Sequence, residues 1–321
     1  MMVLSGADLV LPDRILPSGT LVVDGGRIVD IRAGAGGTLD HHYILPGFID
    51  VHVHGVEGLD VLDARGAVAA IARRLPKYGV TSFCPTTVAT GPAALRAVLS
   101  EVRNARLSSA GGHARVLPAH LESNFINPAY RGAQPSACLR IPRHALAARA
   151  RTRATIPDES PRYDLAESEM PDFTAADILR EIEQAAPDVG IVTLAPELDG
   201  GLDLTTWLTS RGLSVSLGHS AASFDVAQAA IAAGARQATH LFNRMPPFHH
   251  RAPGLVGAIL QSEDVAAELI CDGVHVHPAA VRAAIRAKRP SRVLAITDGT
   301  AGSGLRDGAR ASLGGQPITV R

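Results

Sequence analysis

Apolar residues along this chain gather in short continuous runs, and helix-length amphipathic segments lie between most of these runs. Continuous apolar strands alternating with amphipathic helices are typical of a parallel sheet whose faces are covered by helices. Eight such units predict a (β/α)8 TIM barrel, with a doubly wound open sheet as the alternative. The runs are ILPGFIDVHVH (44–54), VTSFCPT (80–86), RVLPAHLE (115–122), VGIVTLAPE (189–197), LSVSLGHS (213–220), QATHLF (237–242), AAELICDG (266–273) and RVLAITDG (292–299).

The segments outside this alternation predict the remaining domain organisation. Residues 1–43 alternate like short strands, with Gly25-Gly26 as a hairpin turn, and predict a small N-terminal β domain. The barrel is expected to span 44–300, with a long Arg- and Pro-rich insertion at 123–175 that is either an active-site lid or a mobile segment and is helical in part (HALAARARTRA). Residues 301–321 predict a C-terminal hairpin.

Composition narrows the class of protein. The chain is 46% hydrophobic and 19% charged, which suits a soluble globular protein, and its 31 basic residues balance 31 acidic ones without the basic stripe expected of a nucleic-acid-binding protein. No apolar run is long enough to span a bilayer, so no membrane partner is expected. Cys84, Cys138 and Cys271 are far apart and odd in number, which predicts a reducing, cytoplasmic location.

The ends of the predicted strands carry the candidate chemistry. His52 and His54 are two residues apart on a strand, so both imidazoles point to one face and could bind a metal ion. A single histidine at a strand end is more often structural, but several strand ends together rarely carry His, Glu or Asp without a metal or catalytic centre. The other candidates at strand ends are His120, Glu122, His219, His240, Asp272, His275 and Asp298.

Histidine and carboxylate ligands favour a divalent metal, first Zn²⁺, with Fe²⁺, Mn²⁺ or Co²⁺ as alternatives. The two lysines, Lys77 and Lys288, do not fall at strand ends, so a carboxylate rather than a modified lysine would have to bridge two ions, and Glu122 is the candidate. The remaining histidines lie in predicted loops, where solvent exposure is expected for His41, His42, His113 and His144, while the His249-His250 pair could touch substrate.

Seven segments of the sequence resemble the N-acetylglucosamine-6-phosphate deacetylases of the amidohydrolase superfamily. They occur in the family's order and read PGFIDVHVHG, HLESNFINPAYRGA, LAPE, SLGHS, ATHLFNRMPPFHHRAPGLVGA, DGVHVHP and AITDGTAGSG. The resemblance implies a TIM barrel of the metal-dependent hydrolase type. It also implies a hydrolase acting on a linear amide bond, which deacetylates N-acetylglucosamine 6-phosphate to glucosamine 6-phosphate and acetate.

The resemblance also implies a role for each matching position. Glu122, His219 and His240 would hold the principal metal ion, and His52 and His54 with Asp298 would complete a second site that some members occupy. Asp298 would act as general base and then as general acid. Sugar and phosphate would be bound by Asn243, Arg251 and His275, of which the last two reach into the neighbouring subunit's site in this family, so a homodimer is implied.

The sequence departs from the family pattern at several positions. The usual HLEGPF reads HLESNF, with Ser123 and Asn124 beside a proposed ligand, and Gln134 replaces a histidine that helps to polarise the acetyl carbonyl. Arg244 stands where a small residue is more common and could strengthen anion binding or recognise another substrate. Family members also continue beyond the SLGGQPITV segment, which implies that the N-terminal β domain is incomplete in this chain.

Three other readings follow from these departures. The altered loop and Arg244 allow a deacetylase of a different N-acyl amino sugar. The early end of the match allows a catalytically weak homologue that binds a sugar phosphate or a partner protein. A metal-free structural barrel is the fourth reading. The deacetylase reading is preferred because all the proposed ligand positions are intact.

Overall fold

The computed structural model describes residues 1–34, 36–63, 66–108, 111–147 and 173–321. These residues fall into two compact units, Met1–Phe48 and Ile49–Arg321. The central part of the predicted insertion, residues 148–172, lies outside the described residues. Within the described part of the chain, no helix is long and apolar enough to cross a membrane.

The first unit is a four-stranded sheet with the order β3-β2-β1-β4. β1 pairs antiparallel with β2, β2 antiparallel with β3, and β1 parallel with β4. Gly25 and Gly26 both have positive φ, of 54° and 75°, as the predicted tight turn between β2 and β3 requires. The strands span Met2–Val10 (β1), Ile15–Asp24 (β2), Arg27–Arg32 (β3) and Tyr43–Ile44 (β4).

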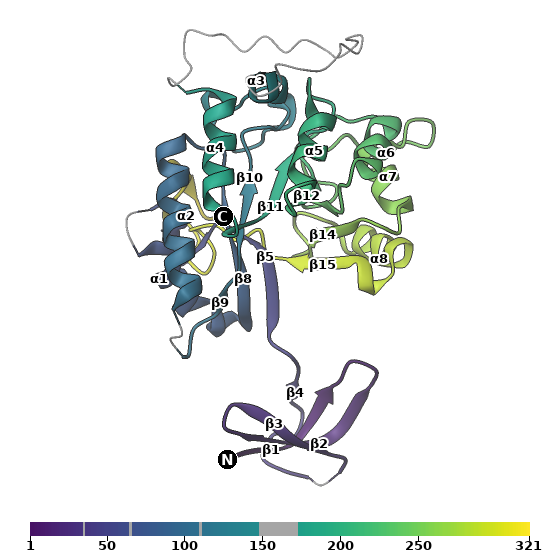
Figure 1. Cartoon of the computed structure of the whole chain (residues 1–321). Coiled ribbons are helices and arrows are strands. Elements are labelled where there is room, and N and C mark those ends of the chain that lie inside the picture. Colours follow the sequence, from purple (N-terminus) through teal and green to yellow (C-terminus); the bar gives the residue numbers. More distant parts are fainter. Residues whose placement is uncertain (35, 64–65, 109–110, 148–172) are drawn as a thin grey trace. The chain divides into compact units, whose positions relative to one another are not determined.

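The second unit contains eight parallel strands in the order β15-β14-β13-β12-β11-β10-β8-β5 (Figure 1). A parallel bridge between Val53 and Gly299 joins the two ends of this path, and the N–H groups of His54 and Gly55 donate to the Gly299 carbonyl at 2.7 and 2.9 Å. The sheet is therefore a nearly closed barrel, and the open-sheet alternative is wrong. The strands are Phe48–Val53 (β5), Val80–Thr87 (β8), Ala119–Glu122 (β10), Val189–Leu194 (β11), Ser214–Leu217 (β12), Gln237–Ala238 (β13), Ala266–Ile270 (β14) and Val293–Ile296 (β15).

Each predicted apolar run contains one barrel strand, but the third run is divided. Its first part, β9 (Arg115–Val116), pairs with β8 away from the main path, and β10 begins only at Ala119. Pro118 stands between the two pieces, and because proline has no N–H to donate, it interrupts a ladder of hydrogen bonds.

Helices lie around the outside of these strands (Figure 1). Their apolar faces join the strands in one large core, which includes Ile71, Phe83 and Leu204, all fully buried. Helix α4 shows how local sequence sets a boundary, because Thr174 and Asp177 form a reciprocal capping box at its start. The helices are Ala67–Arg74 (α1), Pro92–Leu107 (α2), Pro142–Ala147 (α3), Ala175–Ala185 (α4), Gly201–Thr209 (α5), Phe224–Ala232 (α6), Gly254–Gln261 (α7) and Pro278–Lys288 (α8).

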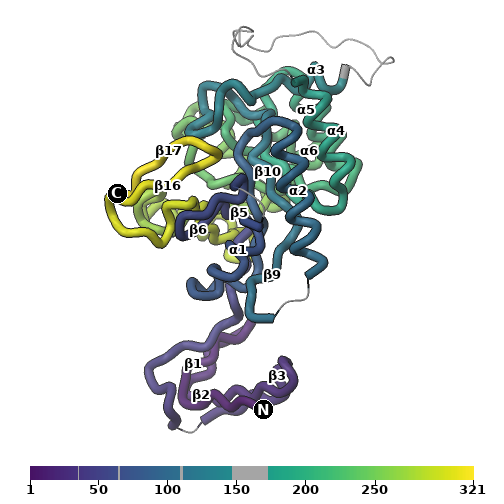
Figure 2. Tube along the Cα trace, turned by 90° about the vertical axis from the view of Figure 1, so that its left-hand side faces the viewer, coloured from purple at the N-terminus to yellow at the C-terminus, as the bar shows by residue number. Residues whose placement is uncertain are grey.

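Short elements complete the second unit. A C-terminal hairpin of β16 (Arg310–Leu313) and β17 (Gln316–Thr319) lies beside the small ribbon of β6 (Gly55–Val56) and β7 (Leu59–Asp60), as Figure 2 shows. The N–H of Gly314 in the hairpin turn donates to Asp60 at 2.8 Å and ties the two together. The 3₁₀ turns span Leu75–Tyr78 (η1), Pro128–Tyr130 (η2), Ser136–Cys138 (η3) and Pro290–Arg292 (η5).

Candidate metal centre and active site

A cavity of about 620 Å³ lies at the carboxyl ends of the barrel strands. Four of its lining residues lie at strand ends: Glu122 is the last residue of β10, and His219, His240 and Asp298 each come two residues after the end of β12, β13 and β15, respectively. This is the edge at which TIM-barrel enzymes build their active sites. The lining residues are His54, Glu122, Ala133, Gln134, His219, His240, Phe242, Asn243, Arg244, Asp272, His275, Thr297, Asp298, Thr300, Ser303 and Leu313.

Glu122, His219 and His240 form the tightest cluster in this cavity. The Oε1 atom of Glu122 lies 2.9 Å from Nε2 of His219 and 3.0 Å from Nε2 of His240, and the two Nε2 atoms are 3.0 Å apart. Two imidazoles and a carboxylate are a common ligand set for Zn²⁺, whose tetrahedral ligands lie roughly 3.3 Å apart. The three side chains are therefore close to the spacing that one metal ion requires.

A second cluster shares Glu122 with the first. The Nε2 atoms of His52 and His54 are 3.2 Å apart, and each lies 3.3 Å from Oδ1 of Asp298 and 3.5 Å from a Glu122 oxygen. The two imidazoles point to one face, as their spacing on a strand predicts. Oε1 of Glu122 faces both histidines of the first cluster and also His52, and Oε2 faces His54, so this carboxylate contacts both clusters.

The hydrogen bonds made by the Nδ1 atoms, on the side of each ring opposite the cluster, indicate whether these histidines suit a metal ion. The Nδ1–H of His54 donates to the Thr86 carbonyl at 3.0 Å, that of His219 to the Tyr130 carbonyl at 2.8 Å, and that of His52 to the Glu268 carboxylate at 2.9 Å. A ring that donates from Nδ1 can keep the lone pair of Nε2 free for a cation. In these three rings Nε2 is the atom that faces the cluster, which fits a metal ion, while Nδ1 of the fourth ring, His240, is buried without a partner among the described residues.

Without a metal, protons take the place of the cation. Burial lowers the pKa of His52, but the charges of Asp298, Glu268 and Glu122 outweigh burial and raise this pKa to about 9. Burial also lowers the pKa of His54, but the hydrogen bonds and charges of Asp298 and Glu122 outweigh burial and raise this pKa to about 10. The charged rings of His52, His54 and His240 in turn hold the pKa of Asp298 far below its usual range, against the effect of burial, so this carboxylate is ionised at neutral pH.

Comparison with known proteins agrees with this geometry. The sequence model of the amidohydrolase family matches residues 43–312. The chain belongs to the amidohydrolase family. It is 37% identical to the N-acetylglucosamine-6-phosphate deacetylase of Rattus norvegicus over 319 residues, which cover 96% of this chain and 68% of the relative. It is 36% identical to the enzyme of that name from Bacillus subtilis, over 87% of this chain and 63% of the relative.

Solved structures show the same relationship for this amidohydrolase. A mutant N-acetylglucosamine-6-phosphate deacetylase from Mycobacterium smegmatis, in complex with N-acetyl-D-glucosamine 6-phosphate, superposes with a TM-score of 0.78 at 30% identity and covers 99% of this chain and 75% of that one. The Thermotoga maritima deacetylase superposes with a TM-score of 0.77 at 27% identity and covers 100% and 76%. The resemblance predicted from the sequence motifs is thereby confirmed.

Several expected substrate-binding residues of the amidohydrolase also line the cavity. Asn243, Arg244, Gln134 and His275 are among them, and the Nδ2 amide of Asn243 is buried without a hydrogen-bond partner in the described part of the chain. His275 is exposed and paired with Asp272, whose Oδ2 lies 2.7 Å from its Nδ1. Arg251 is exposed and is not one of the residues that line this cavity.

The altered loop after Glu122 has a structural explanation. Ser123 is buried, and its hydroxyl donates to the Thr193 carbonyl at 2.6 Å. Asn124 is also buried and donates to the carbonyls of Thr90 and Cys138. Neither side chain lines the cavity. Their side chains therefore support the loop after Glu122 and do not contact the cavity directly.

Several site residues adopt a backbone conformation that side chains usually avoid. The φ angles of His219, His240, Arg244 and Asp298 are 48°, 30°, 53° and 51°. Positive φ costs free energy in residues other than glycine and often marks functional sites.

The remaining histidines match the sequence expectations in part. His41, His42, His113, His144, His249 and His250 are all exposed. His120 is fully buried but does not face the cavity: its Nδ1–H donates to the Val51 carbonyl at 2.9 Å, and its Nε2 lies 2.7 Å from the Thr193 hydroxyl. Burial lowers the pKa of His120 to about 4, so the ring is neutral and structural.

Sequence reasoning overlooked Glu268. Its run, AAELICDG, reads as an apolar strand, and a lone glutamate in it gives little signal until the neighbouring strands are known. The structure buries this carboxylate completely and places it against His52. His52 lies on β5, at the other end of the strand order, so only closure of the barrel between β15 and β5 brings Glu268 and His52 together.

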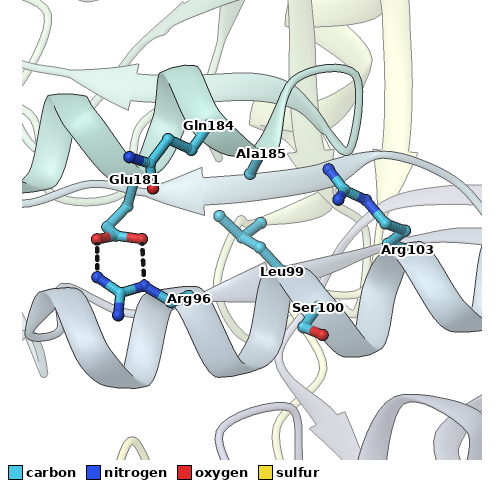
Figure 3. Close-up of a pocket in the computed structure, with 7 residues that line it drawn as sticks. All are labelled: Arg96, Leu99, Ser100, Arg103, Glu181, Gln184 and Ala185. Carbon is cyan, nitrogen blue, oxygen red and sulfur yellow. Dashed lines mark hydrogen bonds and ion pairs between the residues drawn. The ribbon is translucent and has the colours of Figure 1, made fainter.

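A second hollow lies between α2 and α4 and is shown in Figure 3. Its charged side chains already have partners: Arg96 on α2 donates to Glu181 on α4 at 2.9 Å, and Arg103 on α2 donates to Asp188, which follows α4, at 2.6 Å. Because these charges already pair within the protein, we assign no ligand to this hollow.

Proposed function

We propose that this chain hydrolyses the acetamide of N-acetylglucosamine 6-phosphate, giving glucosamine 6-phosphate and acetate. One observation carries the proposal: a single cavity contains the His/Glu/Asp cluster together with the unpaired amide of Asn243 and the guanidinium of Arg244. The cluster supplies groups for amide hydrolysis, and the other two supply donors for a phosphorylated sugar. The deacetylases to which the chain is similar carry the same substrate in their names.

A divalent metal ion, most simply Zn²⁺, would be held by Glu122, His219 and His240. When bound, such an ion polarises a carbonyl and makes a coordinated water more acidic. His52, His54 and Asp298 would hold a second ion. The near-ligand spacing and the fixed Nδ1–H donors support both assignments.

Asp298 is the group placed to move protons. Its carboxylate is ionised, lies in the cavity, and is 23% exposed, so it can reach both the attacking water and the substrate. It accepts a proton as the water oxygen attacks the acetamide carbon. As the carbon–nitrogen bond breaks, Asp298 returns this proton to the departing amine, and acetate leaves with the oxygen of the water.

Arg244 and Asn243 are placed to bind the phosphate and sugar. The Arg244 guanidinium packs against Gly132, where a Cβ atom would lie only 2.6 Å from Nε. Arginine binds phosphate through paired charged donors. Gln134 is placed near the acetyl end because its amide donates to Glu122, and His275 would contact the sugar.

The proposal also includes a homodimer and a cytoplasmic location. Arg251 is exposed and outside the cavity of its own chain, which suits a residue that completes the site of a neighbouring subunit. Cys84, Cys138 and Cys271 are all free thiols, which suits a reducing compartment.

Arg244 favours a second candidate, a deacetylase of another anionic N-acyl amino sugar. The decisive experiment measures acetate release by Zn²⁺-loaded protein from N-acetylglucosamine 6-phosphate, N-acetylglucosamine and N-acetylmannosamine 6-phosphate. The proposal predicts the highest kcat/KM for the first. Faster release from another phosphorylated sugar would support the second candidate, and no release from any would refute both.

A further inference from the structure

Glu268 is a buried carboxylate with three donors around it. It lies on β14 and is completely buried in the barrel. Its Oε2 atom accepts from Nδ1–H of His52 at 2.9 Å and from the backbone N–H of His240 at 3.2 Å. Its Oε1 atom accepts from the side-chain amide of Gln237. Because all three partners donate, the carboxylate acts as an acceptor only, as an ionised group does.

A buried ionised carboxylate destabilises the fold unless its partners compensate for the lost hydration. The partners of Glu268 are informative because two of them belong to the proposed metal centre, one in each cluster. The contact with His52 is to the ring, and it leaves Nε2 facing His54 and Asp298 at 3.2 and 3.3 Å. The contact with His240 is to the backbone, at a residue with a φ of 30°.

Glu268 is not itself placed to bind a metal. Together with His52 and His120 it forms a group of three potential ligands, but His120 already donates from Nδ1 to the Val51 carbonyl, and its Nε2 contacts Thr193. Glu268 also lies on the Nδ1 side of the His52 ring, away from the cavity, and it is not among the cavity-lining residues.

His52 differs from the other two histidines whose Nδ1 is held. The acceptors for His54 and His219 are main-chain carbonyls, of Thr86 and Tyr130. The acceptor for His52 is an ionised side chain, which fixes the tautomer and also makes the ring a stronger electron donor to a metal. His52 is also the ring whose orientation can be changed by substituting a residue that does not touch the cavity.

We propose that Glu268 is the positioning residue of the second metal subsite, orienting His52 so that an ion can bind between His52, His54 and Asp298. This inference rests on the metal-dependent part of the proposed function. Loss of a carboxylate behind a ligating histidine typically lowers metal affinity by about 10–100-fold. The effect is expected at the second subsite, because Glu268 holds the ring of His52 but meets the Glu122–His219–His240 cluster only through the backbone N–H of His240.

The test is the Zn²⁺ stoichiometry and stepwise affinity of Glu268→Gln, measured by competition with a chromophoric chelator. Glutamine has the same shape, and the amide of Gln237 can turn to accept from it, so the fold is expected to survive. Glu181→Gln is the matched control, because Glu181 is also a buried carboxylate but pairs with Arg96 in the hollow between α2 and α4 (Figure 3).

The proposal predicts that the wild type binds two ions, that Glu268→Gln binds the weaker one about 10–100-fold less tightly, and that its tighter ion is held as in the wild type. The control should match the wild type for both ions. Equal affinities in folded Glu268→Gln, or a wild type that binds a single ion, would overturn the proposal. If Glu268→Gln does not fold, Glu268→Asp provides the same comparison, because the shorter aspartate keeps the negative charge but places the carboxylate farther from His52.

These measurements involve no substrate. Absence of acetate release from two-ion wild-type protein would refute the proposed function and leave the role of Glu268 intact. Acetate release from wild-type protein that binds a single ion would support the proposed function and refute the role of Glu268.

Discussion

Gln134 is held at both ends of its amide, and this makes it the most informative residue to change. It is 3% exposed. Its carbonyl oxygen accepts from the buried N–H of Ala89 at 2.7 Å, and its amide donates to Oε2 of Glu122. The residue was expected from the sequence to act on the substrate's acetyl group. The structure gives it a further task, which is to fix the carboxylate that both proposed metal subsites share.

Gln134→Leu removes both hydrogen bonds with little change in volume. The buried Ala89 N–H is then unsatisfied, which costs about 1–3 kcal/mol, and the lost bond to a charged acceptor is worth about 1.5–3 kcal/mol. Because contacts that share a site are not additive, we expect the metal-free protein to lose about 2–5 kcal/mol of unfolding free energy. Urea denaturation of metal-free wild type and variant measures this difference.

Gln134→Glu is the matched variant. It keeps an acceptor for Ala89 but places a second carboxyl group against Glu122, so one of the two pKa values is raised. A carboxyl whose pKa is raised by folding stabilises the protein at low pH, and this contribution is lost as the pH rises through the raised value. Gln134→Glu should therefore approach wild-type stability as the pH falls toward 5. Wild-type stability of Gln134→Leu, within about 0.5 kcal/mol, would refute the reasoning, since that is the range of neutral surface changes.

Two further predictions follow from the charges of the site. Arg244→Met should raise KM for the phosphorylated substrate by about 10–100-fold, the value of one or two charge-assisted hydrogen bonds, and leave KM for the unphosphorylated sugar unchanged. Gly132→Ala, which displaces the same guanidinium, should change KM in the same direction. Equal effects on the KM values of both sugars would contradict the assignment of Arg244 to the phosphate. Metal-free protein should lose stability as the pH rises from about 6.5 through about 9 and 10. The lower limit is the pKa of histidine in the unfolded chain, and the upper values are the pKa values of His52 and His54 in the folded protein. Stability falls because the folded state binds more protons than the unfolded state in this range. A urea midpoint that is constant from pH 6.5 to 10 would contradict the second prediction.

The parts of the account that depend on periodicity could be predicted from sequence. The eight apolar runs each contain a barrel strand, and the alternation of faces correctly orients His52 and His54. The bridge between Val53 and Gly299 that closes the barrel joins positions 246 residues apart, and no local sequence pattern predicts such a contact. The division of the third run at Pro118 was visible in the sequence but was outweighed by the apolar residues around it.

The parts of the site that depend on contacts between strands could not be predicted. Glu268 acquires its role only from the strands that pack against it, and the acceptors that hold His54 and His219 are main-chain carbonyls, which leave no trace in the choice of residue. Ser123 and Asn124 show the converse case, in which a visible difference in sequence concerns the support of a loop. Their difference from the family pattern suggested a changed pocket, whereas their side chains satisfy buried carbonyl groups of the loop.

The central claim is that Asp298 moves the proton in a metal-dependent amide hydrolysis. Its most direct test is the rate of acetate release from N-acetylglucosamine 6-phosphate by Asp298→Asn, compared with wild type at matched Zn²⁺ content. General acid–base catalysis contributes about 10²–10⁴-fold, so the account predicts a fall in kcat of that size. A variant that retains its metal and turns over within about tenfold of the wild type would contradict the assignment of Asp298, since that difference is below what loss of a catalytic base produces.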